Sequence, residues 1–467
     1  MSKRRPEQRM QTNSVYGAVV ICSFLLCTLT TLQYVKSKAK FFGAPHDLQQ
    51  LVYTPRRLSE DDDSPQNELM KQIVAADTNL ISIEFPEGHS LKDDSYTGII
   101  GVFCKLDFDK QKKEPNKYPM FRDLVHASGC NASNEIRVDL GKAAELVRDH
   151  DTKVFQESYN SGSDVSLNGP SVLSLKGAVF HESRCGSTLV ANALVALNPE
   201  KNRVYSESAP PKLVLKKCGE DFVGCSIKGA ANLLRDVVYL MGRSNDPAEE
   251  NLFFKFQSTT TRTMEVFRVA FPTTPWIFLY REPIEVMQSQ LSMQDTSTSN
   301  CVRNYKKSPM IKLLARKLRL KMKDIENEEI CALHLATICG SALVHLEDAN
   351  GLGMTINYHK DMAIEFLDYI FPRHFHTPVH KEGYKRVMEV SKLYSKSPNG
   401  QDQVFESDKD EKRAKASRSI QEAAVEFLDP SYKKLEKSQY NMNKICDQIN
   451  LDSRISSVYC RALSRKN

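Results

Sequence analysis

The chain has 467 residues, of which 41% are hydrophobic and 26% are charged, a composition that is ordinary for a folded globular protein. Its formal net charge is +6, from 64 basic and 58 acidic side chains. This mild excess gives no reason to expect a nucleic-acid partner, and the length allows one main domain with additional segments.

The most apolar segment lies near the N-terminus, where residues 15–35 carry no charged side chain. About 20 helical residues are needed to cross a bilayer, so this segment predicts a transmembrane helix. Basic residues flank both of its ends, and the positive-inside rule therefore barely favours one orientation. A cleaved signal peptide is the alternative, but the apolar region is long and no A-x-A-like site follows closely. We expect a signal-anchor over residues 14–35, preceded by a cytosolic tail of residues 1–13.

Two segments of different character follow the apolar span. Residues 36–95 are typical of a stem, because the acidic run at 59–65 is rich in turn-forming residues and cannot form a core. Residues 96–165 contain a strand-like stretch at 97–104 and a helix-like stretch at 141–148. We interpret this second segment as an N-terminal subdomain.

Alternating strand and helix patterns then continue to about residue 372. Strands are expected near 176–181, 203–206, 252–257, 276–280 and 353–358, and helices near 187–197, 226–241, 259–271, 283–294 and 326–349. This alternation predicts a parallel sheet between two layers of helices, a three-layer α/β fold. We assign residues 166–375 to this core and residues 376–467, which are polar and helical, to a C-terminal extension of it.

Cysteine usage and one sequon bear on the cellular compartment. The chain has 12 cysteines but no C-x-x-C pair, so a zinc site is not expected. In an oxidising lumen some of them should pair, and Cys218–Cys225 and Cys446–Cys460 are plausible local pairs among several possible connectivities. Asn131 begins the only N-x-S/T sequon, which agrees with a luminal domain.

The first of two similar segments lies early in the core, where an apolar strand leads through His181, Glu182 and Ser183 into Arg184-Cys185-Gly186-Ser187-Thr188 and then a helix. Free N–H groups at a helix start attract anions, and an arginine and a glycine at the turn favour their close approach. The Walker A pattern G-x-x-x-x-G-K-[ST] is absent. A plain turn capped by Ser187 or Thr188 is the alternative, but a cap alone does not explain Arg184 beside Gly186.

The second segment repeats this arrangement, because the apolar strand 275–280 ends at Arg281 and Pro283 opens a helix. Ser289 follows eight residues after the arginine. The alternative is a surface arginine, a proline favoured in any first helical turn, and a solvent-facing serine. Two strand–turn–helix anion sites in one chain suit a ligand with two separate phosphate-like ends.

Further side chains extend this candidate site. Glu207 follows the second core strand and is our candidate for accepting a proton from an attacking hydroxyl, with His181 as the second candidate. A solvated loop glutamate is the alternative for Glu207. Lys255 is a charge within an apolar strand, where it either reaches an anion or lies at the strand edge. The basic residues within 303–323 form either a solvated helix face or a track for a polyanion.

Taken together, these segments resemble the PAPS-dependent sulfotransferase family, whose donor is 3′-phosphoadenosine 5′-phosphosulfate (PAPS). The loop Arg184 to Thr188 resembles the family's 5′-phosphosulfate loop, and Arg281 with Ser289 resembles its 3′-phosphate site. The segment Met354 to Asp361 resembles the family's late Tyr-Glu-Asp-Leu segment, although His-Lys intervenes between tyrosine and aspartate. The resemblance covers residues 171–375, less than half of the chain.

This resemblance implies an enzyme that moves a sulfuryl group from PAPS to a hydroxyl acceptor, a carbohydrate by analogy with the Golgi branch of the family. Arg184 and its loop would hold the phosphosulfate and Lys255 the donor phosphates, while Glu207 would take the acceptor proton. Neither a metal nor a nucleic-acid partner is expected. A membrane anchor and stem are typical of the family's single-pass Golgi members, whose catalytic domain is luminal. The alternatives are a non-catalytic, membrane-anchored nucleotide-binding protein and a P-loop-type kinase, which would need a Walker lysine.

We expect residues 36 onward to be luminal and Asn131 to carry a glycan, because the apolar span would act as an uncleaved anchor. In intact microsomes, added protease should leave the C-terminal domain undigested. Glycosidase treatment should increase the gel mobility of the parent chain but not of the Asn131→Gln variant. Digestion of the C-terminal domain without detergent would contradict this orientation.

Overall fold

The structure is a computed structural model of the chain. It describes residues 65–92, 96–161, 169–292, 296–303, 308–347, 352–358, 362–396, 404 and 408–439. The predicted cytosolic tail, transmembrane segment and Cys446–Cys460 pair lie outside these residues.

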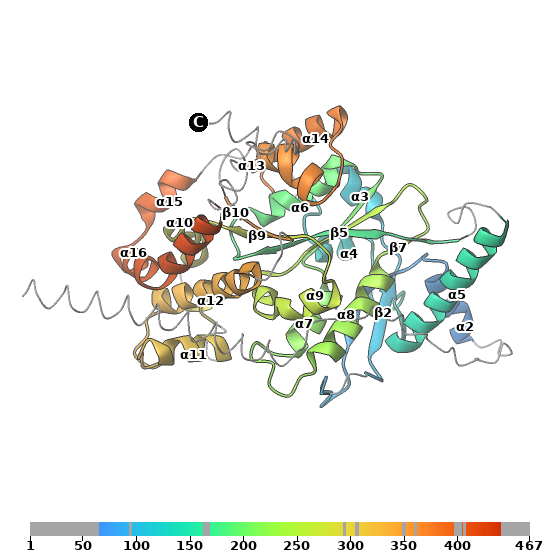
Figure 1. Ribbon diagram of the computed structural model, residues 1–467, viewed down its shortest axis with the longest axis horizontal. Coiled ribbons are helices and arrows are strands. Elements are labelled where there is room, and N and C mark those ends of the chain that lie inside the picture. The colour runs from blue at the N-terminus through green and yellow to red at the C-terminus, as the bar shows by residue number, and fades with distance from the viewer. Residues whose placement is uncertain are drawn as a thin grey trace, which may run out of the picture.

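The centre of the fold is a five-stranded sheet in which all neighbouring strands are parallel (Figure 1). The strand order is β10 (Gly353–Asn357), β9 (Trp276–Tyr280), β5 (Ser174–His181), β8 (Asn251–Lys255) and β6 (Asn202–Ser206). These are the five strands predicted from the sequence, so the parallel α/β core is confirmed. Because β5 is central, the loop after it is flanked by the loops that follow β9 and β8.

Side chains along each strand alternate between two hydrophobic cores, one on each face of the sheet. On β5, Ala178 and Phe180 join the larger core, whereas Val179 joins the smaller one. On β9, Phe278 and Leu279 divide between the two cores in the same way. Burial of both faces explains why these strands are continuous apolar runs in the sequence.

Helices cover both faces of the sheet and complete the three layers (Figure 1). The larger core includes residues of α7 (Ala209–Lys217), α8 (Ile227–Met241), α9 (Met264–Ala270), α10 (Pro283–Leu291) and α12 (Asn327–Glu347). The smaller core includes residues of α6 (Ser187–Leu197), α13 (Met362–Glu365), η5 (Phe366–His374) and α14 (Lys381–Ser391). The short η2 (Ser258–Thr263) precedes α9.

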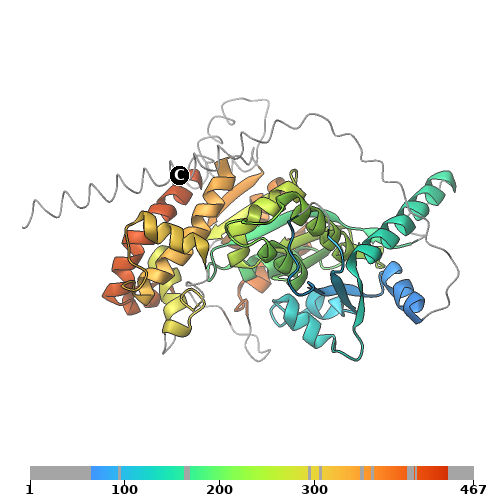
Figure 2. The ribbon, with the colours of Figure 1, turned by 90° about the horizontal axis from the view of Figure 1, so that it is seen from below.

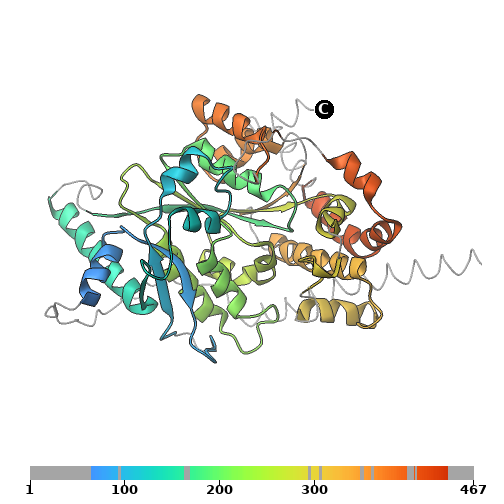
Figure 3. The same cartoon turned by 180° about the vertical axis from the view of Figure 1, so that it is seen from behind.

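The N-terminal part contains a second, antiparallel sheet, seen in blue in Figure 3. Its strands are β1 (Asn79–Glu84), β2 (Ile100–Cys104) and β3 (Ile136–Asp139), and its helices are α2 (Pro65–Val74), α3 (Phe108–Lys113), α4 (Phe121–Ala127) and α5 (Leu140–Ser161). The assignment of residues 36–95 to a stem is wrong for the described part from residue 65 onward. There β1 pairs with β2 and packs on α7 and α8, and Leu80 and Ile83 are buried.

One buried arginine joins the N-terminal helices to the core. Arg243 lies in β7 (Arg243–Ser244), which pairs with β4 (Ser171–Val172). Its guanidinium group donates to both carboxylate oxygens of Asp151 on α5, at 2.7 and 2.8 Å, and to the carbonyl oxygens of Ile73 and Val74. The end of α2 is therefore held beside α5, as Figure 2 shows.

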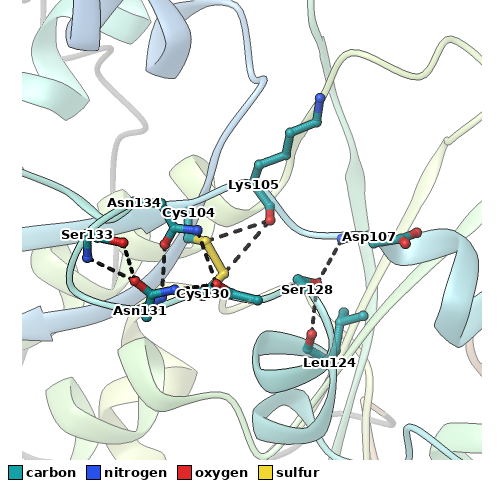
Figure 4. Close-up of a disulfide and its surroundings, with 10 residues drawn as sticks. Cys104, Lys105, Asp107, Leu124, Ser128, Cys130, Asn131, Ser133 and Asn134 are labelled. Atoms are coloured by element: carbon teal, nitrogen blue, oxygen red, sulfur yellow. Dashed lines mark hydrogen bonds between the residues drawn. A yellow bond between two sulfur atoms is a disulfide. The ribbon is translucent and has the colours of Figure 1, made fainter.

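The described residues form three disulfides, Cys104–Cys130, Cys218–Cys225 and Cys301–Cys331. The second of these pairs was suggested by the sequence. Cys130 is followed by Asn131, whose side-chain oxygen accepts a hydrogen bond from the N–H of Ser133 at 3.0 Å (Figure 4). Asn131 is exposed, so a glycan at the sequon would extend into solvent.

The C-terminal residues pack beside the sheet rather than forming a separate body. The elements here are α15 (Lys409–Lys415), α16 (Arg418–Ala423) and η7 (Ala424–Leu428), whereas η3 (Thr296–Thr298) and α11 (Pro309–Lys317) lie earlier in the chain, before α12. Helix α15 contacts α10, and both α16 and η7 contact α12. Among the described residues α12 alone is long and apolar enough to span a bilayer, but 67% of its apolar window is buried in the fold.

We expect Phe267→Ala to lower the free energy of unfolding by about 3–5 kcal/mol, the usual range for an aromatic residue removed from a core. Phe267 is fully buried, and its ring lies 5.4 Å from the rings of both Phe180 and Phe256. Chemical denaturation would measure the loss. Val269→Ala on the same helix is the control. Val269 is 40% exposed, so this substitution should lower the free energy of unfolding far less. Equal losses for the two variants would contradict this packing.

Candidate functional site

Each strand of the central sheet delivers a candidate side chain at its carboxyl end. His181 ends β5, Lys255 ends β8, Glu207 follows β6, Arg281 follows β9 and Tyr358 follows β10. Ligands of open parallel sheets bind at this edge, where the strand order reverses direction around the central strand. The fold thus gathers residues that are widely separated in the sequence.

The first loop has the backbone form of an anion site. Ser183, Arg184 and Gly186 all have positive φ angles, of 90°, 53° and 78°. Among the described residues, no acceptor is paired with the N–H groups of Arg184, Gly186 and Thr188. Successive N–H groups in such a turn form a concave site for an anion. The N-cap of α6 is Gly186, so neither Ser187 nor Thr188 caps the helix and the plain-cap alternative does not fit.

Gly186 is required by its neighbour as well as by its backbone conformation. A Cβ atom at this position would lie 2.3 Å from Cδ2 of Tyr358, and the φ angle of 78° also favours glycine. The tyrosine ring therefore packs directly on the loop. Asp361, the aspartate of the same segment, lies outside the described residues.

The two predicted anion loops are in direct contact. The exposed side chain of Arg184 in the first loop donates from Nε to Oγ of Ser289 on α10, at 2.8 Å. From its spacing in the sequence, Ser289 was predicted to lie with Arg281 at a separate site. In the structure Ser289 contacts the arginine of the first loop, and the two loops also meet where the N–H of Arg281 donates to the Glu182 carboxyl group.

The guanidinium group of Arg281 already has anionic partners within the chain. Only 6% of its side chain is exposed. Its Nε donates to Glu285 Oε2 at 2.9 Å, and its Nη2 donates to Asp408 Oδ1 at 3.1 Å. The guanidinium also lies over the ring of Tyr358, 4.7 Å from the ring centre. Charge, aromatic stacking and hydrogen bonds together hold Arg281 in one position.

A lysine of α15 adds a further cation near Arg281. Lys412 Nζ lies 2.6 Å from Asp408 Oδ2. Burial lowers the pKa of Lys412, and the nearby charges of Arg281 and Arg184 lower it further against the opposing effect of Asp408. Through Asp408, Lys412 is linked to Arg281 of the second loop. Sequence reasoning missed it, because Asp408 and Lys412 are an ordinary i,i+4 charge pair in a polar helix.

Glu207 and Lys255 form a buried ion pair on the other side of the first loop. Lys255 is 1% exposed, and its Nζ contacts Glu207 Oε1. Glu207 has a φ angle of 55°, and its N–H donates to the carbonyl oxygen of Lys255 at 2.7 Å. Burial alone would raise the pKa of Glu207, but the charge and hydrogen bond of Lys255, together with His181 and Lys396, outweigh burial and lower that pKa to about 2. Lys255 is therefore in direct contact with Glu207, the predicted base.

His181 connects the first loop to the end of β8 through two hydrogen bonds to backbone groups. Its Nε2 donates to the carbonyl oxygen of Phe256 at 3.0 Å, and its Nδ1 accepts from the N–H of Ser183 at 3.1 Å. Burial, and then the charge of Lys255, lower the pKa of His181 to about 3, so the ring is neutral. Both ring nitrogens are occupied by backbone groups, which leaves neither for a phosphate or an acceptor hydroxyl.

Glu182 is a component that sequence reasoning did not identify. One of its carboxyl oxygens accepts from the N–H of Arg281, and the other lies 3.3 Å from Sγ of the buried, free Cys339 on α12. Burial raises the pKa of Glu182 to about 8, in spite of the Arg281 N–H. The carboxyl group therefore joins the end of β5 to the start of the second loop in its neutral form. No sequence pattern marks this contact.

Within the part of the chain that the structure describes, no group of three or more His, Cys, Asp or Glu side chains is arranged to hold a metal ion. Comparison with known proteins adds no assignment. No family model matches the chain, and no curated protein or solved structure gives a significant match. The interpretation of the site depends on its own residues and geometry.

We expect Glu182→Gln to remove a pH dependence from stability. The folded-state pKa of about 8 lies above the ordinary 4.5, so the folded chain retains a proton that the unfolded chain releases. This contribution is complete below pH 4.5 and is lost as the pH rises towards 8. The free energy of unfolding of the parent should therefore fall, relative to the variant, over this range. Denaturant titrations at several pH values would measure the difference.

The matched control is Glu200→Gln, which removes an exposed carboxylate from the loop after α6. Its unfolding free energy should follow the parent at every pH. Parallel curves for the parent and Glu182→Gln would mean that Glu182 is not buried in its neutral form.

Proposed function

We propose that this chain is a PAPS-dependent sulfotransferase that transfers a sulfuryl group to a hydroxyl acceptor. The observation that carries the proposal is the 2.8 Å contact between Arg184 and Ser289, which joins two strand–turn–helix anion loops at the carboxyl ends of adjacent strands. A ligand with two anionic ends can contact both loops at once. PAPS has such ends, a 5′-phosphosulfate and a 3′-phosphate.

The donor has a natural orientation on these two loops. The first loop offers the free N–H groups of Arg184, Gly186 and Thr188 together with the exposed guanidinium of Arg184, which suits the 5′-phosphosulfate. The second loop offers the fixed fork of Arg281, which suits the 3′-phosphate. Ser289, between them, contacts the arginine of the first loop.

In the proposed reaction the acceptor oxygen attacks the sulfur atom of the phosphosulfate. A new oxygen–sulfur bond forms as the bond from sulfur to the bridging oxygen breaks, and that oxygen departs on the 5′-phosphate. The loop N–H groups and Arg184 stabilise the negative charge that develops on it. Glu207 takes the proton of the acceptor hydroxyl. Phosphosulfate and acceptor thus become a sulfate ester and a bisphosphorylated nucleotide.

Lys255 connects donor binding to the strength of the base. A carboxylate with a pKa of about 2 is a poor proton acceptor at neutral pH. Donor binding would give Lys255 a second anionic partner, because its Nζ lies beside Glu207 at the end of β8, the strand that pairs with β5. Weaker pairing with Lys255 would raise the pKa of Glu207 and make it a better base once the donor is in place.

The remaining expectations belong to the same proposal. A carbohydrate acceptor and a luminal position in the Golgi membrane rest on the family resemblance and on the apolar N-terminal segment. The three disulfides agree with an oxidising compartment. A nucleotide-binding protein without activity has the same donor site, so turnover must be measured to distinguish the two.

The decisive test is incubation of the full chain with labelled PAPS and a panel of glycans, proteins and small alcohols. We expect Glu207→Gln to retain donor binding but to lose about a hundredfold or more in turnover, the usual scale for a general base. The control is Glu250→Gln, an exposed residue just before β8 at the opposite end of the strand, and it should match the parent. Arg184→Ala should lose both binding and turnover.

The possible outcomes separate the alternatives. Turnover by Glu207→Gln at the parent rate would place the base elsewhere. PAPS binding without label transfer to any acceptor would favour the binding protein. A parent chain that does not bind PAPS would contradict the proposal.

A further inference from the structure

A carboxylate from the C-terminal segment lies where the second anion loop would hold a phosphate. Asp408, just before α15, contacts Arg281 Nη2 at 3.1 Å and Lys412 Nζ at 2.6 Å. The aspartate side chain is 40% exposed, whereas that of Arg281 is only 6% exposed. Two cations thus converge on one anion that solvent can reach.

We propose that Asp408 competes with the 3′-phosphate of the nucleotide for Arg281 and Lys412. Asp408 must leave these two cations before the 3′-phosphate can bind them. The proposal rests on the proposed function for the identity of the nucleotide. On binding, the ion pairs of Asp408 with Arg281 and Lys412 would be replaced by ion pairs of the phosphate with the same two cations. This gives the start of α15 a role that the sequence did not suggest.

The two carboxylates on Arg281 differ in how firmly they are held. Glu285 lies within α10, is 4% exposed, and also lies 3.2 Å from Arg413 Nε. Asp408 precedes a seven-residue helix in which no side chain is buried. Asp408 is the N-cap residue of α15 but makes no capping hydrogen bond and is 40% exposed, so its side chain can turn away while Lys412 stays in place. Glu285 therefore remains as the fixed partner, and Asp408 is the partner that can be exchanged.

A phosphate is a stronger ligand for this position than a carboxylate. It carries more charge and offers more acceptor oxygens, so it can contact the Arg281 fork and the Lys412 ammonium together. A nucleotide without the 3′-phosphate cannot replace Asp408, so the ion pairs of Asp408 stay intact. Competition should therefore weaken the binding of bisphosphorylated nucleotides only.

The test is isothermal titration calorimetry on the full chain in detergent with adenosine 3′,5′-bisphosphate, adenosine 5′-monophosphate and inorganic phosphate. We expect Asp408→Asn to bind the bisphosphate about tenfold more tightly, because a competing state reduces apparent affinity in proportion to its population. Affinity for the monophosphate should not change. Asp410→Asn, the same change on an exposed residue of the same helix, is the control and should match the parent for all three ligands.

A bisphosphate affinity that is equal or lower in Asp408→Asn would overturn the proposal, as would an equal gain for the monophosphate. Inorganic phosphate separates this result from a failure of the proposed function. If the parent does not bind the bisphosphate, but phosphate binds more tightly to Asp408→Asn and not to Arg281→Ala, the sulfotransferase proposal fails and the competition stands. If phosphate binds equally to the parent and Asp408→Asn, the competition is wrong.

Discussion

Parallel pairing of β5 with β9 on one side and β8 on the other determines where the first loop, Arg281 and Lys255 lie. The register pairs His181 with Leu279 and Val179 with Lys255, so the three strands end close to the same level. Loops that follow parallel strands must emerge at one edge of the sheet. The contact of Arg184 with Ser289 depends on this pairing, as does the burial of Glu182 between the first loop and Arg281.

Buried cations at this edge are each paired with a carboxylate of the chain. Lys255 is paired with Glu207, and Arg281 with Glu285 and Asp408. An unpaired charge in such a position would be strongly destabilising, so the fold needs these anions before any ligand arrives. An anionic ligand would compete for the same cations. In the function proposed above, exchange of these internal pairs would link ligand binding to the ionisation of Glu207.

Local sequence patterns determined the architecture of the core. Continuous apolar runs bounded by turns identified all five strands, because each strand is buried on both faces. The sequence also indicated the arginines of both loops, because each of them follows the end of an apolar run. The short spacing of Cys218 and Cys225 also indicated a pair. The end of the stem was predicted too late in the chain, because the acidic run at 59–65 gave no sign that residues 65–92 are folded.

Contacts between distant segments were decided by the tertiary structure alone. Ser289 pairs with Arg184 rather than with Arg281, although it is far closer to Arg281 in the chain, because α10 carries it towards the neighbouring loop. Asp408 reaches Arg281 only after the chain has returned to pack α15 on α10. Periodicity and turn signals report the environment of single residues and their near neighbours. They contain no information about which distant side chain supplies a buried charge with its partner, and that requires the packed fold.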